Sequence, residues 1–181
     1  EESSDDQISD DQISDDNSIL LLKKQNKNIK IMLDSGASLE VVDRYGNNPL
    51  HHAVSQDQPC QRIIDLSSRS SILPIPQLLL EKASHIDGYI DRQNKQGDTV
   101  LHMSLRKGYI NLVQLLILQG ANTDIVNNNG ELPLDIAINV YQHKHIDYKH
   151  IITDLISLTK PEMIAGCIEK ATGDHMRNWL E

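Results

Sequence analysis

The stretch that decides the fold runs from Asn94 to Asp124 and reads NKQGDTVLHMSLRKGYINLVQLLILQGANTD. It opens with a polar turn, and Thr99 is placed to cap a helix that ends at Gly108. A second helix follows, because four apolar residues recur at helical spacing (Ile110, Val113, Leu116, Ile117). Gly120 then suits the left-handed residue that ends many helices. The stretch predicts two short helices joined by a short loop and followed by a hairpin.

Two other segments match this stretch position by position. Gly97-Asp-Thr-Val-Leu-His-Met-Ser104 aligns with Gly46-Asn-Asn-Pro-Leu-His-His-Ala53 and with Gly130-Glu-Leu-Pro-Leu-Asp-Ile-Ala137. Gly97 and Gly130 lie 33 residues apart. Two helices this short cannot bury their apolar faces against each other alone, so such a unit needs neighbouring copies. The matches therefore predict a stack of repeats.

This pattern resembles the ankyrin-repeat family, whose repeat reads D-x-x-G-x-T-P-L-H-x-A and continues with a leucine-rich helix and G-A-D. Gly36-Ala37 and Gly120-Ala121 match the last of these motifs, and the likeness covers roughly Ser18 to Leu158. The resemblance implies an all-α ankyrin-repeat solenoid of about four repeats with β-hairpin-like turns, plus extra C-terminal helices. Thr-Pro-Leu-His is nowhere intact, which indicates a diverged natural array.

The charge of the chain lies mainly at its beginning. The net charge is −9, and residues 1–16 contain eight carboxylates and no basic residue, so the remainder is nearly neutral. No basic patch of the kind that binds nucleic acid is present, and no apolar run is long enough to span a bilayer. Cys60 and Cys167 form no paired pattern, which favours a reducing compartment. We expect a cytoplasmic protein, with the nucleus, or the host cytosol for an effector, as alternatives.

Residues 1–17 form the first of three expected regions. They contain the pentad Asp-Asp-Gln-Ile-Ser twice in succession, from Asp5 to Ser14, and this composition predicts a disordered acidic tail. Three roles fit the tail. It could attract a partner with a basic surface, be phosphorylated, with Ser3 as the best-placed serine, or keep the protein soluble.

The ankyrin-repeat region is expected at residues 18–158, with capping helices at 159–181. Ser18–Lys24 and Ile29–Ser35 resemble a shortened first repeat, and the second repeat carries an insertion at about residues 56–75. Gln61–Leu66 and Gln77–Ala83 are candidates for its second helix, and the latter matches the family better. Thr159–Glu162 reads as a capping box for a helix to about Lys170, whose apolar residues would cover the open end of the stack (Ile164, Ala165, Ile168).

The sequence offers no case for catalysis. His143, His145 and His150 are the nearest approach to a metal site, but their spacing does not suit helical ligand pairs, so we expect no metal and no cofactor. His51 and His102 occupy the Leu-His position that is structural in ankyrin repeats, where the ring connects neighbouring turns. No phosphate-binding glycine loop and no nucleophile elbow is found.

Binding of another protein is the function that the resemblance implies. Ankyrin proteins typically bind through their turn tips and the inner face of their first helices. We expect a monomer that binds a protein partner and neither nucleic acid nor membrane, as an adaptor, inhibitor or targeting scaffold; the alternative is a regulatory or substrate-targeting part of a larger enzyme or of a host-directed effector. The matching positions are Arg44, Tyr45, Asn47, Ser55, Gln56, Lys95, Gln96, Asp98, Arg106, Lys107, Asn128, Asn129, Glu131, Asn139 and Val140.

Overall fold

The computed structural model describes residues 24–55, 75–144 and 148–170. The acidic segment, the helix candidate at Gln61–Leu66, most of the expected insertion and the C-terminal residues from 171 onward lie outside these ranges. The side chain of His143 and all of His145 also lie outside them, so the prediction for this histidine group stays a prediction.

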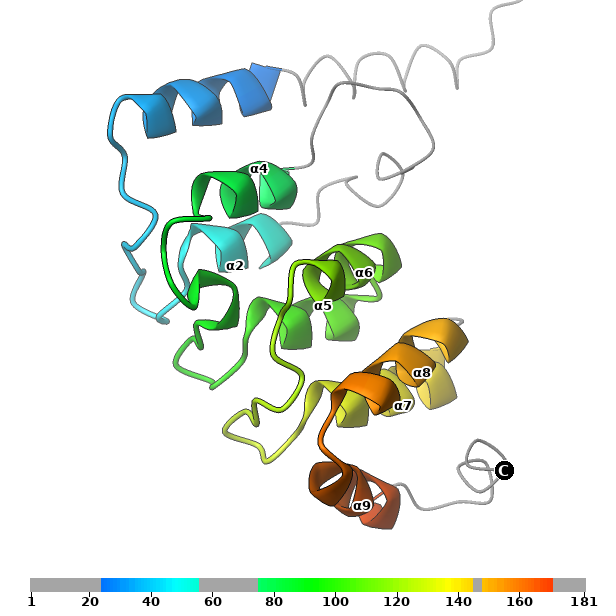
Figure 1. The fold of residues 1–181 in the computed structure, drawn as a ribbon. Coiled ribbons are helices and arrows are strands. Elements are labelled where there is room, and N and C mark those ends of the chain that lie inside the picture. The colour runs from blue at the N-terminus through cyan, green and yellow to red at the C-terminus, as the bar shows by residue number, and fades with distance from the viewer. Residues whose placement is uncertain (1–23, 56–74, 145–147, 171–181) are drawn as a thin grey trace, which may run out of the picture.

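The described helices form pairs that stack along one direction (Figure 1). Three pairs are complete: α2 with α4, α5 with α6, and α7 with α8. Each first helix contacts its own partner and the first helix of the next pair, and α9 contacts α7 at the end of the stack. The described residues contain no strand and no helix long and apolar enough to cross a membrane. The elements after the helix at 24–34 are α2 (Pro49–Ser55), α4 (Ile75–Lys82), the 3-10 helix η1 (Tyr89–Asp91), α5 (Val100–Lys107), α6 (Ile110–Leu118), α7 (Pro133–Lys144), α8 (Lys149–Leu158) and α9 (Pro161–Lys170).

The helix signals in the opening stretch are confirmed. Thr99 and His102 form a reciprocal capping box at the start of α5, in which each side chain accepts the other residue's backbone N–H. Gly108 ends α5 with φ 81°, and Gly120 has φ 81° in the turn that follows α6. A left-handed residue at these two places lets the chain reverse after each short helix, and glycine adopts it without a Cβ penalty.

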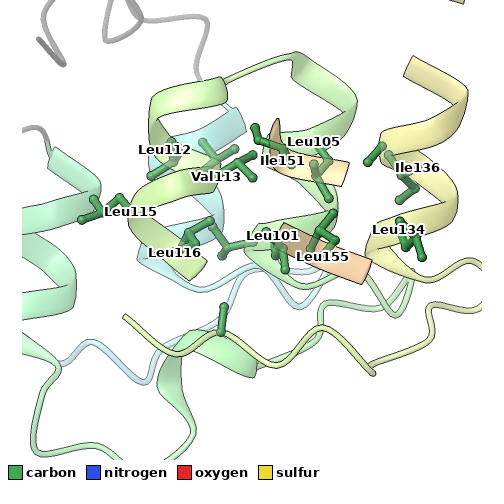
Figure 2. Close-up of a cluster of buried hydrophobic side chains, with 14 of the residues drawn as sticks. Leu101, Leu105, Leu112, Val113, Leu115, Leu116, Leu134, Ile136, Ile151 and Leu155 are labelled. Carbon is green, nitrogen blue, oxygen red and sulfur yellow. The ribbon is translucent and has the colours of Figure 1, made fainter. Parts of the chain in front are cut away.

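An aliphatic core joins the pairs. Leu101 and Leu105 on α5, Leu116 on α6 and Leu155 on α8 are fully or almost fully buried and meet in one cluster (Figure 2). Ile151 and Ile152 of α8 are also buried, as the apolar stripe predicted, and Ile156 packs against the core while partly exposed. Because the chain has no Phe, branched aliphatic side chains from adjacent pairs fill the space between helices.

Two expectations about the first two repeats have clear outcomes. Gln77–Ala83 was the preferred candidate for the second helix, and α4 lies there and contacts α2. The first repeat differs from expectation, because residues 24–34 form one continuous helix with no turn between Lys24 and Ile29. The intervening Gln25–Asn28 contains neither Gly nor Pro, so nothing there terminates a helix.

The capping box expected at Thr159–Glu162 is wrong, although the helix after it exists. Thr159 ends α8 as its C-cap, and its buried hydroxyl finds no hydrogen-bond partner in the described residues. Pro161 is the first residue of α9, so Lys160 holds the cap position and Glu162 is one residue too early for a box. Ala165 was expected to cover the stack but is exposed, and Cys167 is buried in the core instead.

Leu116→Ala should lower the free energy of unfolding by about 2–5 kcal/mol, because it leaves a cavity between helix pairs. Leu118→Ala is the matched control on the same helix, since Leu118 is 76% exposed. Urea denaturation of both variants measures the difference. A loss for Leu116→Ala below about 0.5 kcal/mol, the range of surface changes, would contradict its central position.

Candidate functional site

Three loops of the same construction project from the stack, and we call them the tip loops. They are Asp43–Asn47, Asn94–Asp98 and Asn127–Glu131. In each, the N–H of the first residue donates to the carbonyl of the fifth, and the first side chain's Oδ1 accepts the N–H groups of the third and fifth residues. An Asp or Asn is needed at the first position because only a short acceptor side chain reaches both N–H groups.

Neighbouring tip loops are hydrogen-bonded to each other. The Lys95 N–H donates to the Tyr45 carbonyl at 2.9 Å, and the Asn128 N–H donates to the Gln96 carbonyl at 3.0 Å. Gly97 has φ 75°, and a Cβ there would lie 2.6 Å from the Asn128 nitrogen. Glycine is therefore required both by the backbone conformation and by the close approach of the next loop. These bonds fix the positions of the loops relative to one another.

Buried histidines form a second set of links between repeats. The Thr99 N–H donates to His102 Nδ1 at 3.2 Å, so Nδ1 carries no proton. His102 Nε2 therefore carries it and donates to the Glu131 carbonyl of the next tip loop, at 3.2 Å. His51 makes the equivalent contact, with Nε2 3.1 Å from the Asp98 carbonyl. The structural role expected for both histidines is confirmed.

The His51 link is less well satisfied than the His102 link. Asn48 Oδ1 accepts the His51 N–H and also lies 2.7 Å from His51 Nδ1, so both ring nitrogens face acceptor oxygens. Burial lowers the pKa of His51, which keeps the ring neutral with a single N–H for the two contacts. Asn48 Nδ2 is buried and has no partner in the described part of the chain. The Thr99 hydroxyl avoids this conflict because it both donates and accepts.

A charged cluster closes the space between the second and third tip loops. Arg106 of α5 donates through both terminal nitrogens to the Asp98 carboxylate, and its Nη2 also lies 3.0 Å from Glu131 Oε2. Asn127 Nδ2 donates to Asp98 Oδ1 at 2.8 Å and to Glu131 Oε2 at 2.9 Å. Burial alone would raise the pKa of Asp98, but the hydrogen bonds from Arg106 and Asn127 outweigh it and lower that pKa.

Comparisons with known proteins agree with this geometry. The family model described as ankyrin repeats (3 copies) matches residues 67–148. The chain therefore contains ankyrin repeats. An Arabidopsis thaliana protein named as an E3 ubiquitin-protein ligase, XBAT34, is 25% identical over 165 residues, which is 90% of this chain and 38% of that protein. The human NF-kappa-B inhibitor alpha is 26% identical over 106 residues, or 59% of this chain and 30% of the inhibitor.

These relatives are longer proteins, since the chain spans well under half of each. The chicken NF-kappa-B p105 subunit is a further example, 26% identical over 140 residues that make up 66% of this chain and 14% of that subunit. Ankyrin repeats are non-catalytic protein–protein interaction modules, and the chain therefore carries such a module.

The ankyrin tip loops expose six of the residues that the sequence marked for partner binding. We call these six the tip surface: Arg44, Tyr45, Lys95, Gln96, Asn128 and Asn129. The Arg44 guanidinium lies 4.7 Å from the centroid of the Tyr45 ring, and Tyr45 is 47% exposed. Val41 and Val42, which precede the first loop, are also exposed, at 61% and 59%. No pattern in the sequence predicted that these two valines would face solvent.

The other marked residues lie deeper or elsewhere. Asp98 is only 7% exposed, and its carboxylate belongs to the charged cluster, so it does not lie on the accessible face where it was expected. Val140 was expected on the helix face but is buried in the core. Asn139 is exposed on α7, and Gln56 lies outside the described residues. Asn47, Ser55, Arg106, Lys107 and Glu131 are half-buried.

Two carboxylates that sequence reasoning missed also join repeats. Asp91 Oδ1 accepts the Asn122 N–H at 2.8 Å, and Asp124 Oδ1 accepts the Lys160 N–H at 3.0 Å. Each of these Asp residues lies three positions before the first residue of a tip loop. That recurrence is visible in the sequence and could have identified them.

Among the described residues, the first junction between repeats shows no such bond and contains a groove. Glu40 holds the position of Asp91 and Asp124, and its longer side chain reaches Arg92 Nη2 at 2.6 Å. A second ion pair crosses the junction, from Lys82 Nζ to Asp34 Oδ1 at 2.6 Å. The groove at this junction has a volume of about 640 Å³, and its lining is mixed: Leu33, Leu39 and Ile86 are apolar, whereas Glu40, Lys82, His85, Asp87 and Arg92 are polar or charged.

Asn48→Thr should stabilise the ankyrin stack by about 1 kcal/mol at pH 7, because the new hydroxyl can accept the His51 N–H and donate to Nδ1. The converse change, Thr99→Asn, should destabilise it by a similar amount by creating the same conflict at His102. Urea denaturation of both variants tests the pair. If Asn48→Thr lowers the stability instead, the Asn48 side-chain amide contributes more to stability than is lost by its unfavourable contact with His51 Nδ1.

Asp98→Asn should cost about 1.5–3 kcal/mol at pH 7, because it weakens charge-assisted bonds to a buried carboxylate in a partly buried cluster. The folded-state pKa of Asp98 is lowered, so its contribution is complete above the unfolded-state value and is lost as pH falls through the folded-state pKa. The stability difference between wild type and variant should therefore begin to narrow below about pH 4 and should close only below the folded-state pKa. Denaturation curves from pH 7 to about pH 2 measure this, and a gap that does not depend on pH would refute the assignment.

Proposed function

We propose that this chain binds a partner protein on the tip surface and acts through that binding alone, as an adaptor, inhibitor or targeting scaffold. The observation that carries the proposal is the contrast within the tip loops. The side chains of their first and fifth residues are engaged in bonds that hold the array. The side chains of the second and third residues are exposed, and within the described residues only those of the third loop, Asn128 and Asn129, also bond to the array. Side chains at these exposed positions can take part in recognition without disturbing the fold.

Tyr45 and Arg44 are the expected anchor of the contact. Tyrosine and arginine are the residue types most enriched where single side chains dominate binding energy. The Arg44 guanidinium near the Tyr45 ring gives a partly pre-ordered pair, which reduces the entropy lost on binding. Val41 and Val42 lie just before this pair in the chain and add exposed apolar area.

The names of the relatives suggest two finer roles. An inhibitor would cover a surface that its partner needs, as the name of the human NF-kappa-B inhibitor alpha suggests for that protein. A targeting role, as part of a larger enzyme, is favoured by the relatives named as ubiquitin ligases, in which the matched region is 38% of the Arabidopsis thaliana protein and 22% of a rice protein, XBOS34. Full-length context separates the two, because only the second requires an attached catalytic domain.

Tyr45→Ala should weaken binding of a cognate partner by about 2 kcal/mol, or roughly 30-fold in Kd. The partner is first isolated by affinity capture and cross-linking with the wild-type chain, and Kd values are then measured by isothermal titration calorimetry. Lys149→Ala on α8 is the control, because Lys149 is exposed on the second helix of its repeat. Equal Kd values for wild type and Tyr45→Ala, with a large loss for Lys149→Ala, would place the binding site elsewhere.

A further inference from the structure

The exposed charges of the tip surface are both positive. Arg44 and Lys95 are its charged residues, and the other four members are uncharged. The nearby carboxylates are engaged inside the array. Asp43 Oδ1 accepts the N–H groups of Tyr45 and Asn47, and its Oδ2 lies 3.1 Å from His52 Nε2, while Asp98 belongs to the charged cluster with Arg106. The tip surface therefore favours an anionic partner segment.

The series of hydrogen bonds between neighbouring tip loops also leaves one backbone N–H without an acceptor on this surface, among the described residues. At the two later loops, the N–H of the second residue donates to the carbonyl of the preceding loop, from Lys95 to Tyr45 and from Asn128 to Gln96. Arg44 is the second residue of the first loop, and within the described residues no acceptor meets its N–H. A carboxylate placed there would take the position of the missing carbonyl and lie beside the Arg44 guanidinium.

We propose that the tip surface binds acidic segments that carry isolated apolar residues, and that its resident occupant is residues 1–16 of this same chain. These residues supply eight carboxylates, and each Asp-Asp-Gln-Ile-Ser pentad adds one isoleucine. The carboxylates match Arg44 and Lys95, and Ile8 and Ile13 match the exposed apolar area of Val41, Val42 and Tyr45. The inference rests on the proposed function, because the tail and a partner would compete for one surface.

The length of the chain allows this contact. The helix at 24–34 separates the acidic segment from the first tip loop and is about 16 Å long, at 1.5 Å per residue. The 23 residues before Lys24 can span up to about 75 Å when extended. Attachment in the same chain raises the effective concentration of the acidic segment to the millimolar range, so even a weak contact is populated.

A second group of cations is the main competitor for the tail. Lys24, Lys27 and Lys30 are exposed on the helix at 24–34, close in sequence to the acidic segment. One difference separates this group from the tip surface. The lysines offer charge alone, whereas the first tip loop combines charge with an unused N–H and an aromatic ring. The test must therefore distinguish these two places.

Paramagnetic relaxation in the full-length protein makes this distinction. A nitroxide is attached at Ser9→Cys in a Cys60→Ser background, where Cys167 is buried and protected. At about 0.01 M salt the amide signals of Arg44, Tyr45 and Lys95 should be at least about twofold weaker than in the reduced, diamagnetic sample. They should recover at about 1 M salt, where the Debye length falls from about 30 Å to about 3 Å.

Two variants of equal charge change complete the experiment. Arg44→Glu with Lys95→Glu should abolish the broadening, whereas Lys27→Glu with Lys30→Glu should leave it in place. Broadening centred on Lys24–Lys30, or broadening that survives Arg44→Glu with Lys95→Glu, overturns the proposal, as does no broadening at low salt. A failure of this inference and a failure of the proposed function give different results. If the tail contacts the tip surface but Tyr45→Ala does not weaken partner binding, only the proposed function is refuted. If Tyr45→Ala weakens partner binding but the tail does not contact the tip surface, only this inference is refuted.

Discussion

The hydrogen bond from a buried histidine ring to the next tip loop is the interaction on which the rest of the array depends. A ring nitrogen inside the protein must find a partner, because an unpaired buried polar group costs about 1–3 kcal/mol. The next loop satisfies it only if it is folded and correctly placed. The histidine in the first helix of a repeat therefore needs the tip loop of the next repeat as its hydrogen-bond acceptor. The donors are His51 and His102, and the acceptors are the carbonyls of Asp98 and Glu131.

The same reasoning explains why the third tip loop departs from the pattern. Asp135 stands where the other repeats have His, and its carboxylate accepts the Leu132 N–H at the start of α7. This carboxylate caps its own helix, but it has no N–H that could donate to a following tip loop. Within the described residues no further tip loop follows, and α9 lies against α7 instead. Loss of the histidine is thus consistent with a repeat whose next neighbour is a single helix.

Sequence reasoning found the features that depend on local chemistry and periodicity. The caps at Thr99 and Gly108, the histidine links and α4 follow from residues whose role is set by near neighbours or by a repeated pattern. The pattern could not show which polar residues would be engaged across repeats. Asp98 and Asn129 both belong to tip loops, yet the former, at the fifth position, is buried beside Arg106 and the latter, at the third, is exposed. The register of α9 was missed since Thr159 serves the preceding helix.

The groove at the first junction has a mechanical consequence. Later junctions are joined through Asp91 and Asp124, whose side chains hold main-chain N–H groups across the boundary. The first is held by the apolar packing of Ile29, Leu33 and Leu39 and by two largely exposed ion pairs, Lys82–Asp34 and Arg92–Glu40. Exposed pairs contribute little and weaken with salt. A force applied along the stack would therefore separate the helix at 24–34 first, while the pairs from α2 to α8 stay joined. We therefore expect this N-terminal link to be the most compliant part of the stack and the part most sensitive to salt.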